Sequence, residues 1–154
     1  ELDIIDLNIK TVHTLTKLFL KDFKKRNSGY ILNVASLAAF LPGPLMATYY
    51  STKAYVLNLT EAIHEELKQE NSNVYIGALC PGPVDTEFND VAKVHFSVSS
   101  QTPSEVVDYA LKKMFRNKLV IIPGFKNRLG LFLTKLLPLK LKLKVCYRLQ
   151  ESKR

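Results

Sequence analysis

The pattern of apolar and polar positions divides the first half of the chain into alternating helices and short buried strands. Apolar residues recur at helical spacing over Leu2–Phe23, and the turn-forming residues 27–29 end this helix. A second helical pattern covers Ala47–Glu70. Tyr30–Ala35 and Val74–Cys80 are nearly continuous apolar runs bounded by turn residues, which is typical of strands buried in a parallel sheet.

The second half of the chain continues the alternation. Thr102–Glu105 resembles a helix start, with proline in the first turn and glutamate three residues after the threonine. Lys118–Ile122 predicts a third strand. Phe125–Leu137 fits an amphipathic helix, whereas Leu139–Val145 alternates with a period of two and fits a strand or a helix equally well.

This order of elements predicts an α/β fold with parallel strands. Three strands make a small sheet, and the apolar character of Tyr30–Ala35 on both faces indicates that this strand has a neighbour on each side. The chain opens at Glu1, directly in helical sequence. We therefore expect further strands of the sheet to come from a preceding segment.

Charge is distributed unevenly and marks the end of the chain as a basic tail. The net charge is +8, yet residues 1–111 carry 9 Lys and Arg against 13 acids, whereas 13 Lys and Arg follow from Lys112 onward with Glu151 as the sole acid. We interpret the tail as a solvated cationic surface, with peripheral attachment to an anionic membrane as the alternative. No nucleic-acid partner is expected.

Cysteine use and hydropathy indicate where the protein resides. Cys80 and Cys146 have neither the spacing of a zinc site nor that of a disulfide framework, which predicts a reducing compartment and no metal. No apolar run approaches the length that spans a bilayer, and no cleavable signal is visible. We expect a cytoplasmic protein.

Candidate chemistry centres on a tyrosine and a lysine. Tyr49 and Lys53 are four residues apart on a predicted helix and so share one face. An ammonium group close to a phenol stabilises the phenolate and lowers the phenol pKa from about 10. Such a tyrosine serves as general acid or base for a carbonyl and alcohol pair. The spacing alone is weak evidence, because Tyr109 and Lys113 repeat it.

A serine distinguishes the Tyr49–Lys53 pair from the Tyr109–Lys113 pair. Ser36 precedes Tyr49 by 13 residues, where the first strand is predicted to end, whereas Phe96 stands at the same distance before Tyr109. The carboxyl ends of strands line the ligand crevice of open α/β sheets. A hydroxyl at this edge is placed to bond a substrate oxygen that Tyr49 also contacts.

Together these motifs resemble the short-chain dehydrogenase/reductase family, over nearly the whole chain. The segments that carry the resemblance are Asn33–Ser36, Tyr49–Ala54 and Pro81–Thr86. It implies the C-terminal part of a Rossmann-like doubly wound sheet over residues 1–124, with 125–154 as a basic amphipathic tail. It further implies Tyr49 as acid/base, Ser36 as the group that orients the carbonyl, and Lys53 as the group that lowers the tyrosine pKa and contacts the nicotinamide ribose.

The resemblance also assigns residues outside the Ser–Tyr–Lys set. Asn8 matches the asparagine that holds a proton-relay water near the lysine, and the alternative is that it satisfies local backbone. Pro81, Gly82, Val84 and Thr86 match the segment that lies against the nicotinamide. For Thr86, a helix N-cap is an equal alternative.

One departure from the family is as informative as the matches. The glycine-rich turn that cradles the cofactor pyrophosphate is absent, and so is the residue that distinguishes NAD from NADP. The cofactor is therefore NADP or NAD, and we expect its main binding motif to lie outside this sequence. A truncated or non-catalytic binding protein on the same fold is the alternative to an oxidoreductase.

Two partners are expected, from the apolar residues Leu41, Leu45 and Met46 and the leucine-rich tail for the substrate, and from the apolar surface of the long helices together with the resemblance for a second copy of the chain. The substrate is expected to be a small hydrophobic carbonyl or alcohol, bound among residues 37–46, residues 84–100 and the tail. A homodimer is expected through the two long helices, residues 2–26 and 47–70.

Overall fold

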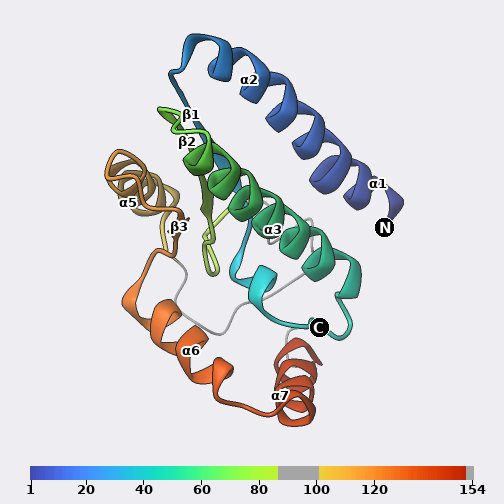
Figure 1. Cartoon of the computed structure of the whole chain (residues 1–154). Helices are drawn as coiled ribbons and strands as arrows, with labels where there is room; N and C mark the ends of the chain where they lie inside the picture. The colour runs from blue at the N-terminus through green and yellow to red at the C-terminus, as the bar shows by residue number, and fades with distance from the viewer. Residues whose placement is uncertain (87–100, 152–154) are drawn as a thin grey trace.

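The computed structural model, which describes residues 1–86 and 101–151, contains one parallel sheet with helices on both faces (Figure 1). The strand order is β1-β2-β3, with β1 at Gly29–Val34, β2 at Val74–Leu79 and β3 at Val120–Ile121. The helical elements are α1 (Leu2–Ile5), the π-helix η1 (Asp6–Thr11), α2 (Val12–Arg26), the 3-10 helix η2 (Leu37–Phe40), α3 (Ala47–Gln69), α5 (Pro103–Met114), α6 (Phe125–Lys135) and α7 (Leu139–Glu151).

The predicted α/β fold with about three parallel strands is confirmed. The third strand is shorter than the sequence indicates, since only two residues of Lys118–Ile122 join the sheet. Leu139–Val145, which fitted a strand or a helix, is helical as part of α7. The first long helix contains the unpredicted π-turn η1, where the hydroxyl of Thr11 donates to the carbonyl of Asp6 at 3.0 Å.

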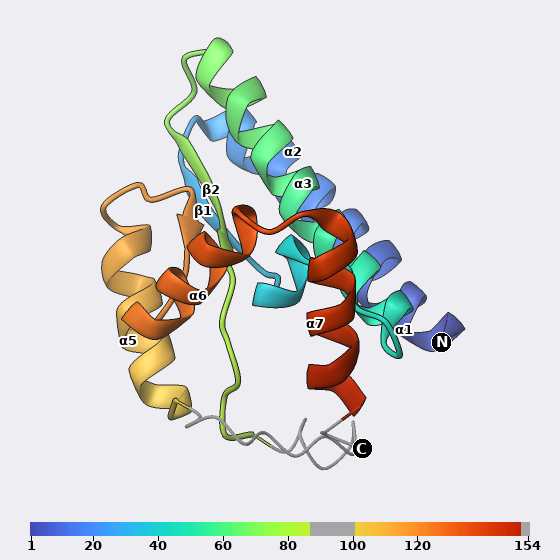
Figure 2. The same ribbon diagram turned by 90° about the horizontal axis from the view of Figure 1, so that it is seen from below.

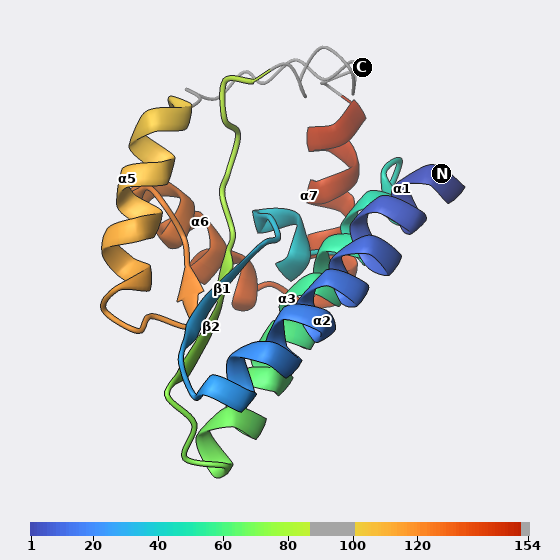
Figure 3. The same cartoon turned by 90° about the horizontal axis from the view of Figure 1, so that it is seen from above.

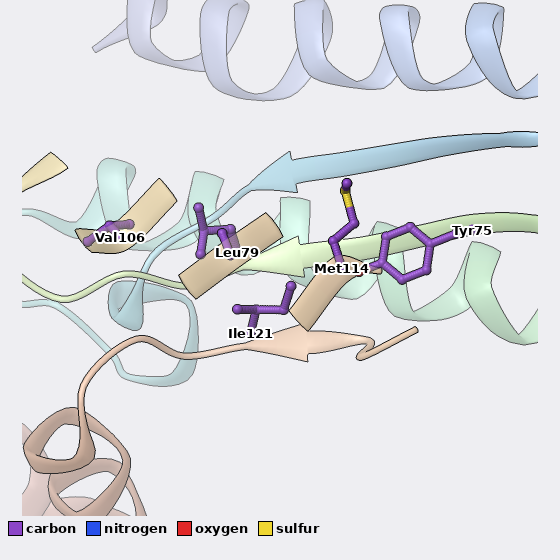
Figure 4. Close-up of a cluster of buried hydrophobic side chains, with 6 residues drawn as sticks. Tyr75, Leu79, Val106, Met114 and Ile121 are labelled. Carbon is purple, nitrogen blue, oxygen red and sulfur yellow. The ribbon is translucent and has the colours of Figure 1, made fainter. Parts of the chain in front are cut away.

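The two faces of β2 bury different helices because successive side chains point to opposite sides of a strand. Tyr75 and Leu79 pack against α5 and β3, and Figure 4 shows them meeting Met114 and Ile121. On the other face, Ile76 packs with residues of α2 and α3. Figure 3 shows the result, with α2 and α3 on one side of the sheet and α5 on the other.

A buried polar network ties β1 to the helices that cover it. The amide oxygen of Asn33 accepts from the hydroxyl of Thr16 in α2 at 3.1 Å, and its amide nitrogen donates to the hydroxyl of Thr60 in α3 at 2.9 Å. Thr60 in turn donates to the carbonyl of Val56 at 2.8 Å. All three polar side chains are buried, so each has exchanged water for a partner inside the protein.

Candidate active site

The carboxyl ends of β1 and β2 meet at one edge of the sheet and carry the predicted site. The backbone N–H of Ala35 donates to the carbonyl of Leu79 at 2.8 Å, and that of Leu37 donates to the carbonyl of Pro81 at 2.9 Å. Parallel pairing thus continues for two steps beyond the strands. These bonds hold Ser36 beside the Pro81–Gly82 segment, at the edge where ligands bind in open α/β sheets.

Ser36 and Tyr49 are in direct contact although 13 residues separate them. Ser36 caps η2, where its hydroxyl accepts from the N–H of Ala38 at 3.1 Å. The same hydroxyl forms a side-chain hydrogen bond with Tyr49, the third residue of α3. The sequence motif therefore folds into a hydroxyl pair at the end of β1.

Lys53 lies one turn after Tyr49 and reaches across the end of β1. Its ammonium nitrogen is 5.9 Å from the centre of the Tyr49 ring and donates to the carbonyl of Val34 at 3.1 Å. Burial lowers the pKa of Lys53, because a desolvated ammonium is less stable than a neutral amine. The lysine is thus held beside the tyrosine ring by its bond to the strand end.

The pKa of Tyr49 differs from what the sequence predicts. Burial raises it above the ordinary value, and the hydrogen bond from Ser36 offsets this only in part. In this arrangement Tyr49 is a protonated phenol at neutral pH, which is the form that donates a proton to a carbonyl oxygen.

This difference gives a pH prediction. In the protein without nucleotide, the phenolate absorbance that Tyr49→Phe removes should have its midpoint above the ordinary tyrosine pKa, because burial raises the pKa of Tyr49. The sign is that of an acid whose neutral form is favoured, so the phenol persists until the pH exceeds the raised pKa. The measurement is a spectrophotometric titration of wild type minus variant. A difference that develops near neutral pH would show that Lys53 controls the group after all.

Asn8 lies in the π-helix η1 and connects it to α3. Its amide nitrogen donates to the hydroxyl of Thr52 at 3.1 Å, and Thr52 donates to the backbone carbonyl of Tyr49 at 2.8 Å. π-Turns inside helices recur at functional sites, because they redirect side chains and free backbone groups. Asn8 is therefore adjacent to the turn of α3 that carries Tyr49 and Lys53, and its role with a water stays a prediction.

The Pro81–Thr86 segment leaves the sheet toward α6. Gly82 packs closely against α6, since an added Cβ would lie 2.7 Å from the side-chain nitrogen of Asn127 and would require that side chain to move. Val84 forms an isolated parallel bridge with Gln101, and Thr86 is exposed. Most of the predicted substrate-binding loop lies outside the described residues. So does the segment in which Thr86 was predicted, as the alternative, to cap a helix.

Sequence reasoning missed a contact from the tail to the site. Gln150 of α7 is buried and its side-chain nitrogen donates to the hydroxyl of Tyr50, whose ring packs edge-on to Tyr49 with centroids 6.0 Å apart. Gly43 allows this placement, because a Cβ there would overlap the Tyr50 ring. The only signal in the sequence was that Cys146 and Gln150 share one face of a helix, which says nothing about a partner 100 residues away.

Cys80 precedes Pro81, and the sequence allows it to face the ligand crevice or to be a buried, inert cysteine. It directly follows β2 and is fully buried in a cluster with Ala35, Val56 and Leu57, close to Ser36 and Lys53. Burial raises the pKa of its thiol to about 12. At neutral pH the Cys80 thiol is therefore protonated, so it packs as an apolar side chain and is not a nucleophile.

Comparison with known proteins identifies related sequences. A family model described as short chain dehydrogenase matches residues 2–94. Dehydrogenase/reductase SDR family member 4 of Bos taurus is 38% identical over 88 residues, which are 57% of this chain and 31% of that protein. Very-long-chain 3-oxoacyl-CoA reductase of Mus musculus is 32% identical over 90 residues, which are 58% of this chain and 28% of that protein.

A solved structure gives the corresponding match in three dimensions. A short-chain dehydrogenase from Sphingobium yanoikuyae in complex with NADPH is 30% identical, with a TM-score of 0.71, and the match covers 79% of this chain and 47% of that chain. The matched segment thus spans about a third of the length of the two curated relatives and about half of the solved one.

Proposed function

The chain belongs to the short-chain dehydrogenase family, and we propose that it carries the proton-transfer centre of an NAD(P)-dependent oxidoreductase that interconverts a carbonyl and an alcohol. The observation that supports this most is the contact between Ser36 and Tyr49 with Lys53 beside the ring. Three residues that the sequence separates by up to 17 positions converge at the carboxyl edge of the sheet. No structural need of the fold requires a hydroxyl, a phenol and an ammonium at one point.

The site fits a nicotinamide nucleotide in its chemistry. The Lys53 ammonium has three N–H donors, of which one goes to Val34, so the others suit a ribose hydroxyl. The Pro81–Thr86 segment leaves β2 beside Ser36, where a planar ring and its carboxamide would meet backbone and the Thr86 hydroxyl. A bound reduced nicotinamide would supply a hydride to the carbonyl carbon.

The residues of the chain would do the rest of the reaction. The Ser36 hydroxyl donates to the substrate oxygen and fixes its position near Tyr49. The Tyr49 phenol donates its proton to that oxygen as it becomes an alkoxide, which yields the alcohol and a phenolate. Asn8 and Thr52 hold the backbone of α3 at this turn, and the Lys53 charge stabilises the phenolate until a proton returns from solvent.

A hydrophobic substrate is proposed from the walls of the site. Leu41, Leu45 and Met46 are half-buried in the segment between η2 and α3, next to Ser36 and Tyr49 in sequence. The name of the mouse relative refers to a long-chain acyl substrate. A ketone with an apolar body is the class that such walls would accept.

A homodimer is proposed through the two long helices. The outer side of α1 to α2 exposes a series of large apolar residues, namely Leu2, Leu7, Leu15, Leu18 and Phe19. Exposed apolar surface of this extent on neighbouring turns marks a protein contact.

The proposed function is tested by turnover. A panel of hydrophobic ketones and small sugars is offered with NADPH or NADH in excess, and loss of the reduced-nicotinamide absorbance is followed. We expect consumption that depends on a hydrophobic ketone. Nucleotide that binds and is never consumed would indicate the non-catalytic alternative, and consumption confined to sugars would contradict an apolar pocket. Because the sequence lacks a glycine-rich turn, we expect nucleotide binding to be weaker than micromolar.

A further inference from the structure

Helix α6 presents an apolar face away from the body of the protein. Leu131 is buried, and α6 packs on η2. Phe125, Leu129, Phe132 and Leu136 are spaced by four, three and four residues, so they form one continuous face opposite Leu131. Their exposed fractions are 69%, 46%, 60% and 69%. The helix therefore buries one narrow side against the protein and leaves its larger apolar side uncovered within the described residues.

Cations flank that face, and α6 itself carries no acid. Lys126 lies on one side of the exposed stripe, and Arg128 and Lys135 lie on the other, by the 100° turn per residue of an α-helix. The sequence contains no Asp or Glu between Tyr109 and Gln150. The surface is thus apolar along its centre and positive along both edges.

Helix α7 extends the positive surface. Cys146 and Gln150 are buried against the body, whereas Lys140, Lys144 and Arg148 form a stripe at four-residue spacing on the other side of the helix. Figure 2, seen from below, shows α6 and α7 in front of the rest of the molecule, and Figure 1 places both at the same end. The two helices therefore share one end of the molecule.

We propose that the exposed face of α6, with the basic stripe of α7, docks on the surface of an anionic lipid bilayer. An amphipathic helix with an aromatic and leucine face edged by lysine and arginine lies in the plane of the interface, with its apolar side among the acyl chains and its cations at the headgroups. Among the described residues, no helix is long and apolar enough to cross a membrane. The contact is therefore lateral.

Charge favours an anionic lipid surface over a second copy of the chain as the partner of the α6 face. Two copies meeting through this face would bring two predominantly positive surfaces together, since Glu151 is the one acid of α6 and α7, and like-charge repulsion opposes this. Anionic headgroups instead complement the flanking cations. The exposed apolar residues of α1 and α2 offer a different surface for self-association, on a helix pair with acids as well as cations.

Docking would place the proposed active site close to the membrane. α6 packs on the turn that Ser36 caps, and α7 holds Tyr50 beside Tyr49. The docking inference itself does not depend on turnover, because its test measures binding alone.

The test is co-sedimentation of the full chain with vesicles of phosphatidylcholine, with and without phosphatidylserine. The variant carries Leu129→Ser, Phe132→Ser and Leu136→Ser. The matched control carries Leu7→Ser, Leu15→Ser and Phe19→Ser, three exposed apolar residues of the other surface. We expect wild type and control to bind the phosphatidylserine vesicles, and the α6 variant to lose binding by more than about tenfold. Added salt should weaken wild-type binding.

Two outcomes would overturn the proposal. One is binding that is equal for the two vesicle types, or unchanged in the α6 variant while its circular dichroism matches wild type. The other is an α6 variant that shifts from dimer to monomer in size-exclusion chromatography while the α1–α2 control does not, which would assign this face to a second copy of the chain.

Discussion

Replacing Tyr49 with phenylalanine should lower kcat for carbonyl reduction by about 10²–10⁴-fold, the contribution typical of a positioned general acid. The substitution removes only the phenol oxygen. The ring keeps its edge-on contact with Tyr50, and the hydroxyl of Ser36 keeps its bond from Ala38. We therefore expect KM to change little and the unfolding midpoint to stay near that of wild type. Steady-state kinetics at saturating nucleotide give kcat and KM. A denaturation curve for each protein gives the unfolding midpoint.

The chain provides a matched control for this substitution. Tyr109 is followed by Lys113 at the same spacing, and the lysine nitrogen lies 5.4 Å from the Tyr109 ring centre, compared with 5.9 Å for Lys53 and Tyr49. The hydroxyl of Tyr109 accepts from Arg128 at 3.4 Å, on the surface of α5. Tyr109→Phe should leave turnover unchanged. Equal losses in the two variants would mean that a Tyr–Lys pair alone, without Ser36 and the strand end, accounts for the effect.

Local signals were enough to predict most elements. The capping box was recognised at Thr102 and Glu105, and the structure has both of its bonds: the Thr102 N–H donates to the Glu105 carboxylate at 3.0 Å, and the Glu105 N–H donates to the threonine hydroxyl at 3.4 Å. Helix α3 begins at the predicted residue and ends one residue early. These features depend on residues within four positions of each other, so sequence reports them directly.

Features that depend on distant residues could not be predicted. The alternation of Leu139–Val145 suited a strand and a helix equally, and packing decides for the helix, because Cys146 and Gln150 are buried on one helical face and Gln150 bonds Tyr50. The hydrophobic pattern of the sequence does not predict the π-turn at residues 6–11. In both cases tertiary contacts determine which conformation is more stable.

The candidate site also has features that the sequence predicts and features that it does not. The convergence of Ser36, Tyr49 and Lys53 follows from topology, because the carboxyl end of a parallel strand and the start of the next helix lie together. The pKa of Tyr49 does not follow, since it depends on how deeply the folded protein buries the phenol and on its hydrogen bond with Ser36. Cys80 illustrates the same limit, because its burial in the folded protein raises the pKa of its thiol.

Replacing Asn33 with alanine should lower the free energy of unfolding by about 2–4 kcal/mol, which is a large share of the stability of a small domain. Asn33 interrupts an otherwise apolar strand, and its amide bonds the hydroxyls of both Thr16 and Thr60. Without it, the buried Thr16 hydroxyl loses its acceptor and a cavity opens between α2 and α3. Chemical denaturation monitored by circular dichroism gives the value.

Two further variants separate this network from a general effect of losing an asparagine. Asn58 is exposed on α3, and Asn58→Ala should change stability by no more than about 0.5 kcal/mol, because alanine also favours a helix. Thr16→Val removes the hydroxyl that Asn33 satisfies, so adding it to Asn33→Ala should cost less than the sum of the two single substitutions. Strict additivity, or a loss in Asn33→Ala no larger than in Asn58→Ala, would show that the buried amide does not join α2, β1 and α3 as the structure indicates.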